Sequence, residues 1–186
     1  WLKHSFKIDA KSFILVVLVS ITLLLYNKYY YLGTKLGTAS LGGAMVTTLI
    51  PILTFIFLAI LGTKKVTSKD VFALLIGAVG VLTMLHIWSF DLARIFVIHN
   101  LYFLLAATLW AILTIISSKS TKISPIVFTF YMYLVTVGLD VLFFVDVSFL
   151  HVKIFDAIFW VNIALISLAA STFSNTIYFL GIEKLG

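Results

Sequence analysis

Long apolar runs separated by short polar breaks make up most of this 186-residue chain. A helix needs about 20 predominantly apolar residues to cross the hydrocarbon core of a bilayer. No run alternates apolar and polar residues with period two, as the strands of a membrane barrel do. The pattern therefore predicts an all-α membrane protein, with six membrane-spanning helices over residues 13–31, 41–61, 71–87, 97–116, 126–145 and 157–179.

Composition supports lipid as the surrounding medium. The chain is 62% hydrophobic and 11% charged, with a mean hydropathy of +1.19. Soluble domains are about 45–50% apolar and about 25% charged. The net charge of +6 comes from Lys residues in the polar breaks, which is typical of membrane proteins. We therefore expect a lipid bilayer as partner and no nucleic acid.

Cysteine and histidine provide no basis for a metal site. The chain has no Cys, and its four His residues are far apart in the sequence. Structural and catalytic zinc sites need such ligands in clusters or at helical spacing. We expect no metal and no other cofactor.

The basic residues predict the orientation of the helices. With six spans, three basic residues lie on one side of the membrane, namely Lys35, Arg94 and Lys153. The side that holds the N-terminal end has nine: Lys3, Lys7, Lys11, Lys64, Lys65, Lys69, Lys119, Lys122 and Lys184. Connections rich in Lys and Arg stay in the cytoplasm. The N-terminal end and the 63–70 connection are therefore predicted to be cytoplasmic.

The ends of the first and sixth spans resemble each other. The first reads N-K-Y-Y-Y-L-G-T-K-L-G and the second N-T-I-Y-F-L-G-I-E-K-L-G. Four positions match at one offset, pairing Asn27, Tyr30, Leu32 and Gly33 with Asn175, Tyr178, Leu180 and Gly181. Chance similarity between apolar helices is the alternative explanation. A true repeat five spans apart would have inverted topology, as in many secondary transporters.

An inverted repeat of this period predicts a ten-helix bundle. Residues 1–90 would be the last three helices of the first repeat, and residues 91–186 the first three of the second. The chain, which begins at Trp1, is expected to be a fragment of a longer protein.

The chain resembles the EamA-type transporters of the drug/metabolite transporter superfamily. Residues 39–62, with Pro51 in mid-helix, resemble their fourth span, and residues 70–85, with Gly77 and Gly80, their fifth. Residues 101–119 resemble the opening span of their second repeat. One departure is Thr63, where the family often has Glu.

The resemblance implies secondary transport of small organic metabolites or drugs, with export as the expected direction. Transport would proceed by alternating access around a midplane site. The resemblance also implies a bacterial plasma (inner) membrane.

Small and polar residues form stripes along several spans, and these supply the candidate solute-binding residues. Trp110 is the leading candidate because it lies in mid-span, whereas Trp usually prefers the membrane interfaces. An indole there can stack on an apolar or cationic solute. Close helix packing is the alternative role for such stripes. The candidates are Trp110, Thr114, Thr47, Asn27, Tyr30, Ser171, Asn175 and Tyr178.

No catalytic motif is present in the sequence. H-E-x-x-H, G-x-S-x-G and the phosphate-binding G-x-x-x-x-G-K-[ST] are all missing, and Asp140 is the one acidic residue within a span. We therefore expect that the protein is not an enzyme. The alternative to a transporter is a non-transporting polytopic membrane protein, such as an assembly subunit or a lipid-modifying enzyme. Homodimer formation is left open.

Overall fold

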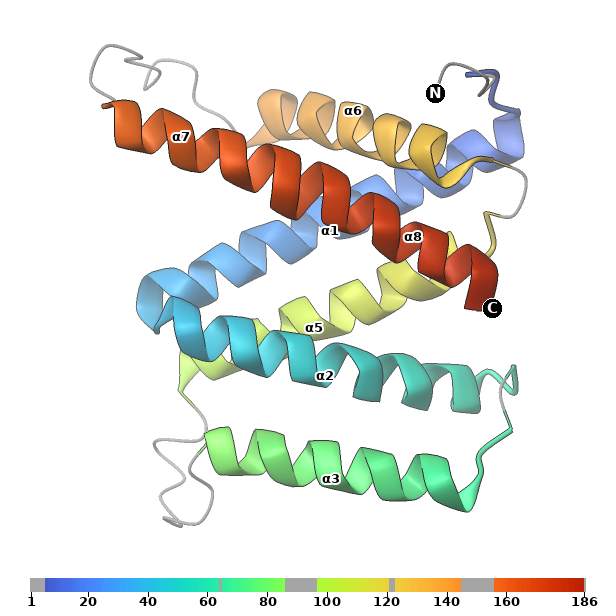
Figure 1. Cartoon of the computed structure of the whole chain (residues 1–186), viewed down its shortest axis with the longest axis vertical. Helices are drawn as coiled ribbons and strands as arrows, with labels where there is room; N and C mark the ends of the chain where they lie inside the picture. The colour runs from blue at the N-terminus through green and yellow to red at the C-terminus, as the bar shows by residue number, and fades with distance from the viewer. Residues whose placement is uncertain (1–5, 64, 86–96, 121–122, 145–155, 186) are drawn as a thin grey trace. The chain divides into compact units, whose positions relative to one another are not determined.

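The computed structural model describes residues 6–63, 65–85, 97–120, 123–144 and 156–185. Every regular element in these ranges is helical (Figure 1). The elements are α1 (Ala10–Leu36), α2 (Ala39–Ile60), α3 (Ser68–Met84), α5 (Ile98–Ser117), α6 (Pro125–Phe143), α7 (Ala157–Leu165), η4 (Ile166–Phe173) and α8 (Ser174–Leu185). The last three follow one another without a break and together form the sixth predicted span.

The predicted all-α membrane fold is confirmed. Five helices are long and apolar enough to cross a bilayer: Ala10–Leu36, Ala39–Ile60, Ile98–Ser117, Pro125–Phe143 and Ala157–Ile182. Helix α3 corresponds to the shortest predicted span and has 17 residues. The ten-helix bundle and its inverted repeat stay predictions.

The chain forms two compact units. We call residues 22–115 the Phe103 unit, and residues 1–21 with 116–186 the Tyr133 unit. Helices α1 and α5 contribute residues to both units. The predicted boundary between residues 90 and 91 lies outside the described residues.

Polar side chains satisfy the backbone groups at several helix starts. Thr67 and Asp70 form a capping box at α3, in which the Asp70 backbone N–H donates to Thr67 Oγ1 (3.3 Å) and the Thr67 backbone N–H donates to Asp70 Oδ2 (3.0 Å). The Asp156 carboxylate accepts from the Phe159 N–H at the start of α7 (2.8 Å). Such caps replace hydrogen bonds that the first turn of a helix cannot make internally.

Gly62 and Thr63 close the C-terminal end of α2. Gly62 adopts a φ of +67°, and its N–H donates to the Ala59 carbonyl (3.1 Å). The Thr63 N–H and its hydroxyl both donate to the Leu58 carbonyl, each at 3.0 Å. This is a Schellman arrangement, which needs a left-handed residue at the Gly62 position. Thr63 thus takes part in capping through its backbone and hydroxyl, without a charge.

A fully buried aromatic ring joins three helices of the Phe103 unit. Phe103 on α5 packs against Gly33 on α1 and Gly42 on α2. A Cβ atom built on Gly33 would lie 2.5 Å from the ring, and one built on Gly42 would lie 2.3 Å from it. Both glycines are therefore required by close approach. Met45, Val46, Ala106 and Ala107 complete the buried cluster.

Helix α3 packs on α2 through one of its two glycines. A Cβ on Gly77 would lie 3.0 Å from Cδ1 of Ile52 on α2, whereas a Cβ on Gly80 would meet nothing within 4 Å. Small residues at both positions suggested close packing from the sequence. The structure limits that role to Gly77 in the described part of the chain.

The Tyr133 unit is held by contacts among the first half of α1, α6 and α8. The buried Ser20 hydroxyl on α1 donates to the Met132 carbonyl on α6 (2.9 Å). The Phe128 ring on α6 meets the Phe179 ring on α8 edge to face, with centroids 5.1 Å apart. Large apolar side chains of α7 and η4 are exposed, including Ile158 and Leu168, as expected for a surface in contact with lipid.

We predict that Gly42→Ala destabilises the protein, because the new methyl group would overlap the Phe103 ring. Overpacking of this kind costs about 1–3 kcal/mol. Gly43→Ala is the matched control, since its Cβ would lie 3.9 Å from the Tyr30 hydroxyl. Thermal unfolding in detergent should show a lower midpoint for Gly42→Ala alone. Adding Phe103→Leu should recover part of the loss, and equal midpoints for the two Ala variants would contradict the packing.

Candidate functional site

A π-helical segment interrupts the sixth span. Over Ile166–Phe173 the helix widens, and the Ser174 N–H donates to the Ala169 carbonyl five residues back. Two hydroxyls span the same separation: Thr172 donates to the Ser167 carbonyl (2.8 Å), and Ser174 donates to the Ala169 carbonyl (3.0 Å). Short π-helical turns inside α-helices are frequent at functional sites. The segment is therefore the first local feature that points to a site.

Tyr133 on α6 binds this segment. Its hydroxyl donates to the Ser171 carbonyl (3.3 Å) and accepts from the Asn175 side-chain amide. Tyr133 is the ninth residue of the 19-residue helix α6, so this polar contact lies near mid-span. We call Tyr133, Ser171 and Asn175 the Tyr133 cluster. It fixes the spacing between α6 and the π-helical segment.

A groove of about 420 Å³ lies next to the Tyr133 cluster, and we call it the α6–η4 groove. Figure 1 shows α6 running alongside the continuous α7–α8 helix. Pockets of about 300–1,000 Å³ are the usual size for small organic ligands. The groove is lined by Ile126, Thr129, Phe130, Tyr133, Leu134, Val137, Thr172 and Thr176.

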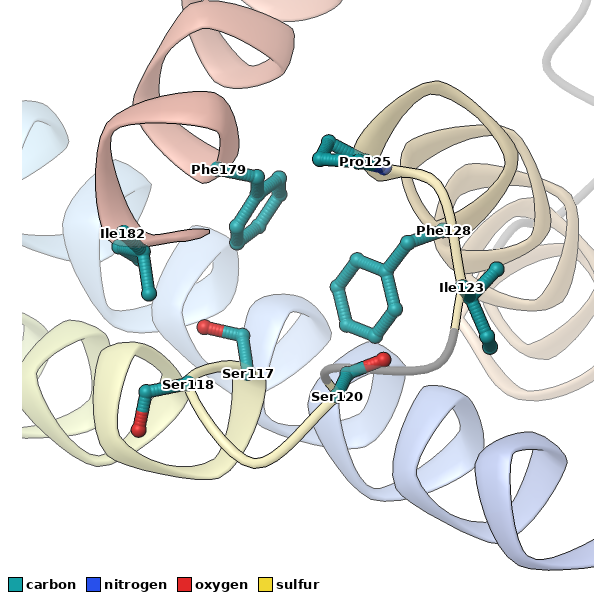
Figure 2. A pocket seen from close by; sticks show the side chains of 8 residues that line it. All are labelled: Ser117, Ser118, Ser120, Ile123, Pro125, Phe128, Phe179 and Ile182. Carbon is teal, nitrogen blue, oxygen red and sulfur yellow. The ribbon is translucent and has the colours of Figure 1, made fainter. Parts of the chain in front are cut away.

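A second cavity of about 30 Å³ lies where α5 leads into α6 (Figure 2). It is lined by Ser117, Ser118, Ser120, Ile123, Pro125, Phe128, Phe179 and Ile182. A volume of this size suits about one water molecule. This cavity is too small for an organic solute.

The leading sequence candidate, Trp110, lies in an aromatic contact within the Phe103 unit. Its ring meets Tyr26 on α1 edge to face, with centroids 4.7 Å apart, and Tyr26 stacks on Tyr30 at 5.8 Å. The Thr114 hydroxyl donates to the Trp110 carbonyl (2.9 Å). Trp110 is half-buried, so helix packing accounts for part of its surface.

The remaining candidates have more local environments. Thr47 is exposed, and its hydroxyl donates to the Gly43 carbonyl of its own helix (2.7 Å). Asn27 is half-buried on α1. The Tyr178 ring on α8 meets Phe179 edge to face at 5.7 Å. The structure thus brings Ser171 and Asn175 together, and groups Trp110 with Tyr30 and Thr114.

Tyr133 was missed from the sequence, although the reasoning applied to Trp110 would have found it. Tyr, like Trp, prefers the membrane interfaces. A Tyr near the middle of a predicted span therefore needs a partner for its hydroxyl. The π-helical segment had no comparable signal, because its sequence is compatible with ordinary α-helix.

The charged residues within the spans are not among the residues that line the groove. Asp140 on α6 is half-buried and Lys28 on α1 is exposed. Among the described residues, no three His, Asp or Glu side chains are grouped where they could hold a metal ion. The chemistry of the groove is therefore that of hydroxyls, backbone carbonyls and apolar side chains.

Comparisons with protein-family models, curated proteins and solved structures gave no match. The resemblance to EamA-type transporters therefore depends on the sequence features described above.

We predict that Tyr133→Phe lowers stability by about 1 kcal/mol, because it removes the acceptor of the Asn175 amide and one of the donors to the Ser171 carbonyl, which the Ser174 N–H also contacts. Tyr131→Phe is the matched control. Tyr131 is on the same helix, and its hydroxyl donates to the Phe6 carbonyl (2.8 Å). This hydrogen bond is exposed, so its loss should cost less. Chemical denaturation in micelles should separate the two variants. An unchanged midpoint for Tyr133→Phe would show that the cluster contributes no stability.

Proposed function

We propose that this chain is part of an EamA-type secondary transporter that exports small organic solutes by alternating access. The observation that carries the proposal is the Tyr133 cluster, which places hydrogen-bonding groups beside a groove near mid-span. Secondary transporters bind their solutes near the membrane midplane, where helices are discontinuous. Irregular backbone at that depth is tolerated where it lines a cavity.

The π-helical segment is a local irregularity of this kind within an otherwise continuous helix. A change of one residue in helical register rotates all following residues by about 100°. Conversion of the segment to α-helix would therefore turn the face that α8 presents to the groove. Such a change can open and close a binding site without breaking the rest of the helix.

The groove lining also supports transport over the alternative of a lipid-modifying enzyme. Among its eight lining residues, the Tyr133 phenol is the one ionisable group. Hydrolytic or transfer chemistry needs converging acids, bases or nucleophiles. Binding and release of a solute needs no such group.

Orientation is part of the proposal. The N-terminal end and the 63–70 connection are placed in the cytoplasm by the bias of basic residues. The membrane would be a bacterial plasma membrane.

We predict that deletion of Leu168 lowers transport while the protein accumulates normally. Removing one residue from the π-helical segment restores α-helical register and keeps the flanking faces in place. Leu168 itself is exposed. Deletion of Ile163 in α7 is the control, since ordinary α-helix cannot absorb it and the protein should accumulate poorly. Flux of a panel of labelled aromatic alcohols, amines, amino acids and organic acids into proteoliposomes provides the measurement.

Two results would count against this account. Absence of flux for every solute in the intact protein would contradict the transport function. Full activity of the Leu168 deletion would show that the π-helical segment has no part in it.

We predict that Ser68→Cys resists an impermeant thiol reagent added outside intact cells. Ser68 begins α3 within the basic 63–70 connection, and the sequence has no Cys of its own. Ser40→Cys, at the start of α2 on the opposite side, should label readily. Reversal of the two results would reverse the orientation.

A further inference from the structure

We infer that the α6–η4 groove selects apolar solutes whose polar end donates hydrogen bonds, such as alcohols, phenols and amines, and that it rejects carboxylates. The inference names the solute class for the proposed transport function and rests on that function for its physiological role. The binding preference itself follows from which hydrogen-bonding groups face the groove.

The three threonines that line the groove have already used their donors. Thr129 donates to the Pro125 carbonyl (2.8 Å), Thr172 to the Ser167 carbonyl (2.8 Å) and Thr176 to the Thr172 carbonyl (2.7 Å). Each hydroxyl has one donor and two acceptor lone pairs. What these residues present to a solute is therefore acceptor oxygen.

The Tyr133 hydroxyl has likewise no free proton to donate to a solute. Its hydroxyl proton is committed to the Ser171 carbonyl, and its oxygen accepts from the Asn175 amide. Each of the four polar side chains of the lining thus donates its hydroxyl proton to a backbone carbonyl. The groove is rich in acceptors and poor in donors.

The α6 side of the groove also presents a run of apolar side chains, which we call the apolar wall. Ile126, Phe130, Leu134 and Val137 follow one another at helical spacing on α6 and form a single stripe along the groove. A hydrocarbon or aromatic body can bury its surface there, and a ring can pack against Phe130.

A carboxylate has acceptors and no donor. In this groove it would give up water and find neither a donor nor a cation, which is strongly unfavourable at membrane depth. An alcohol, phenol or amine would instead donate to the threonine oxygens. A lipid chain could fill the apolar wall, but it would gain nothing from the acceptors.

The test uses three probes that share one ring system. 2-Naphthol can donate a hydrogen bond, 2-methoxynaphthalene cannot, and 2-naphthoate carries a negative charge. Equilibrium dialysis against the full chain in nanodiscs, corrected with empty nanodiscs, gives each affinity. We expect 2-naphthol to bind about tenfold more tightly than 2-methoxynaphthalene, in line with about 1.4 kcal/mol for one hydrogen bond. We expect no binding of 2-naphthoate.

The double variant Thr172→Val with Thr176→Val should bring the two neutral probes to nearly equal affinity. Thr48→Val is the matched control, because Thr48 makes the same kind of bond to the Ala44 carbonyl (2.8 Å) within α2. Binding of 2-methoxynaphthalene, which needs the apolar wall alone, checks that the variants keep the groove.

Several outcomes would overturn the inference. They are equal binding of the neutral probes to the unaltered protein, binding of 2-naphthoate, no probe binding above empty nanodiscs, and a preference that survives the double substitution. Selective binding of 2-naphthol without flux would leave the inference standing and contradict the transport proposal instead.

Discussion

Inside a bilayer every backbone N–H and C=O must find its partner within the protein, since lipid offers none. Most of the described structure follows from that constraint. It requires continuous helices, and it explains why hydroxyls so often donate to carbonyls of their own helix, as Thr47 and Thr136 do. The π-helical segment obeys the same rule by a different pattern, because Thr172 and Ser174 add side-chain donors to carbonyls five residues back.

The two units use small and polar residues for opposite purposes. In the Phe103 unit, Gly33 and Gly42 leave room for the Phe103 ring, and α1, α2 and α5 pack closely around it. In the Tyr133 unit, the Tyr133 hydroxyl bridges α6 to η4 and α8 and leaves the α6–η4 groove beside it. Tight packing through apolar contact and spacing through a polar bridge can therefore coexist in one short chain.

Much of the fold could be predicted because a membrane helix is specified by residues that are contiguous in the sequence. A run of apolar residues of sufficient length identifies a membrane helix, and the five helices that meet that length overlap the predicted spans. Less of the candidate site could be predicted from the sequence. Ser171 and Asn175 were found as polar residues in lipid, but their partner Tyr133 became evident only from tertiary contact.

The π-helical segment lay beyond sequence reasoning for a clear reason. Its turns differ from α-helix by a single residue of register, and the residue types of the segment fit both. The sequence also did not distinguish Gly77, which packs against Ile52, from Gly80, whose Cβ position meets nothing within 4 Å, because periodicity identifies a small residue but not the presence of a neighbour.

Helix α3 has a consequence for the membrane itself. Its 17 residues rise about 26 Å, whereas a typical hydrocarbon core is about 30 Å thick. The Thr67–Asp70 cap stops the helix from extending at its start. As a spanning helix, α3 would pull the two leaflets together around it, at a fraction of a kcal/mol for each ångström of mismatch. The bilayer would be thinnest beside α3, and the protein would favour regions of membrane that are already thin.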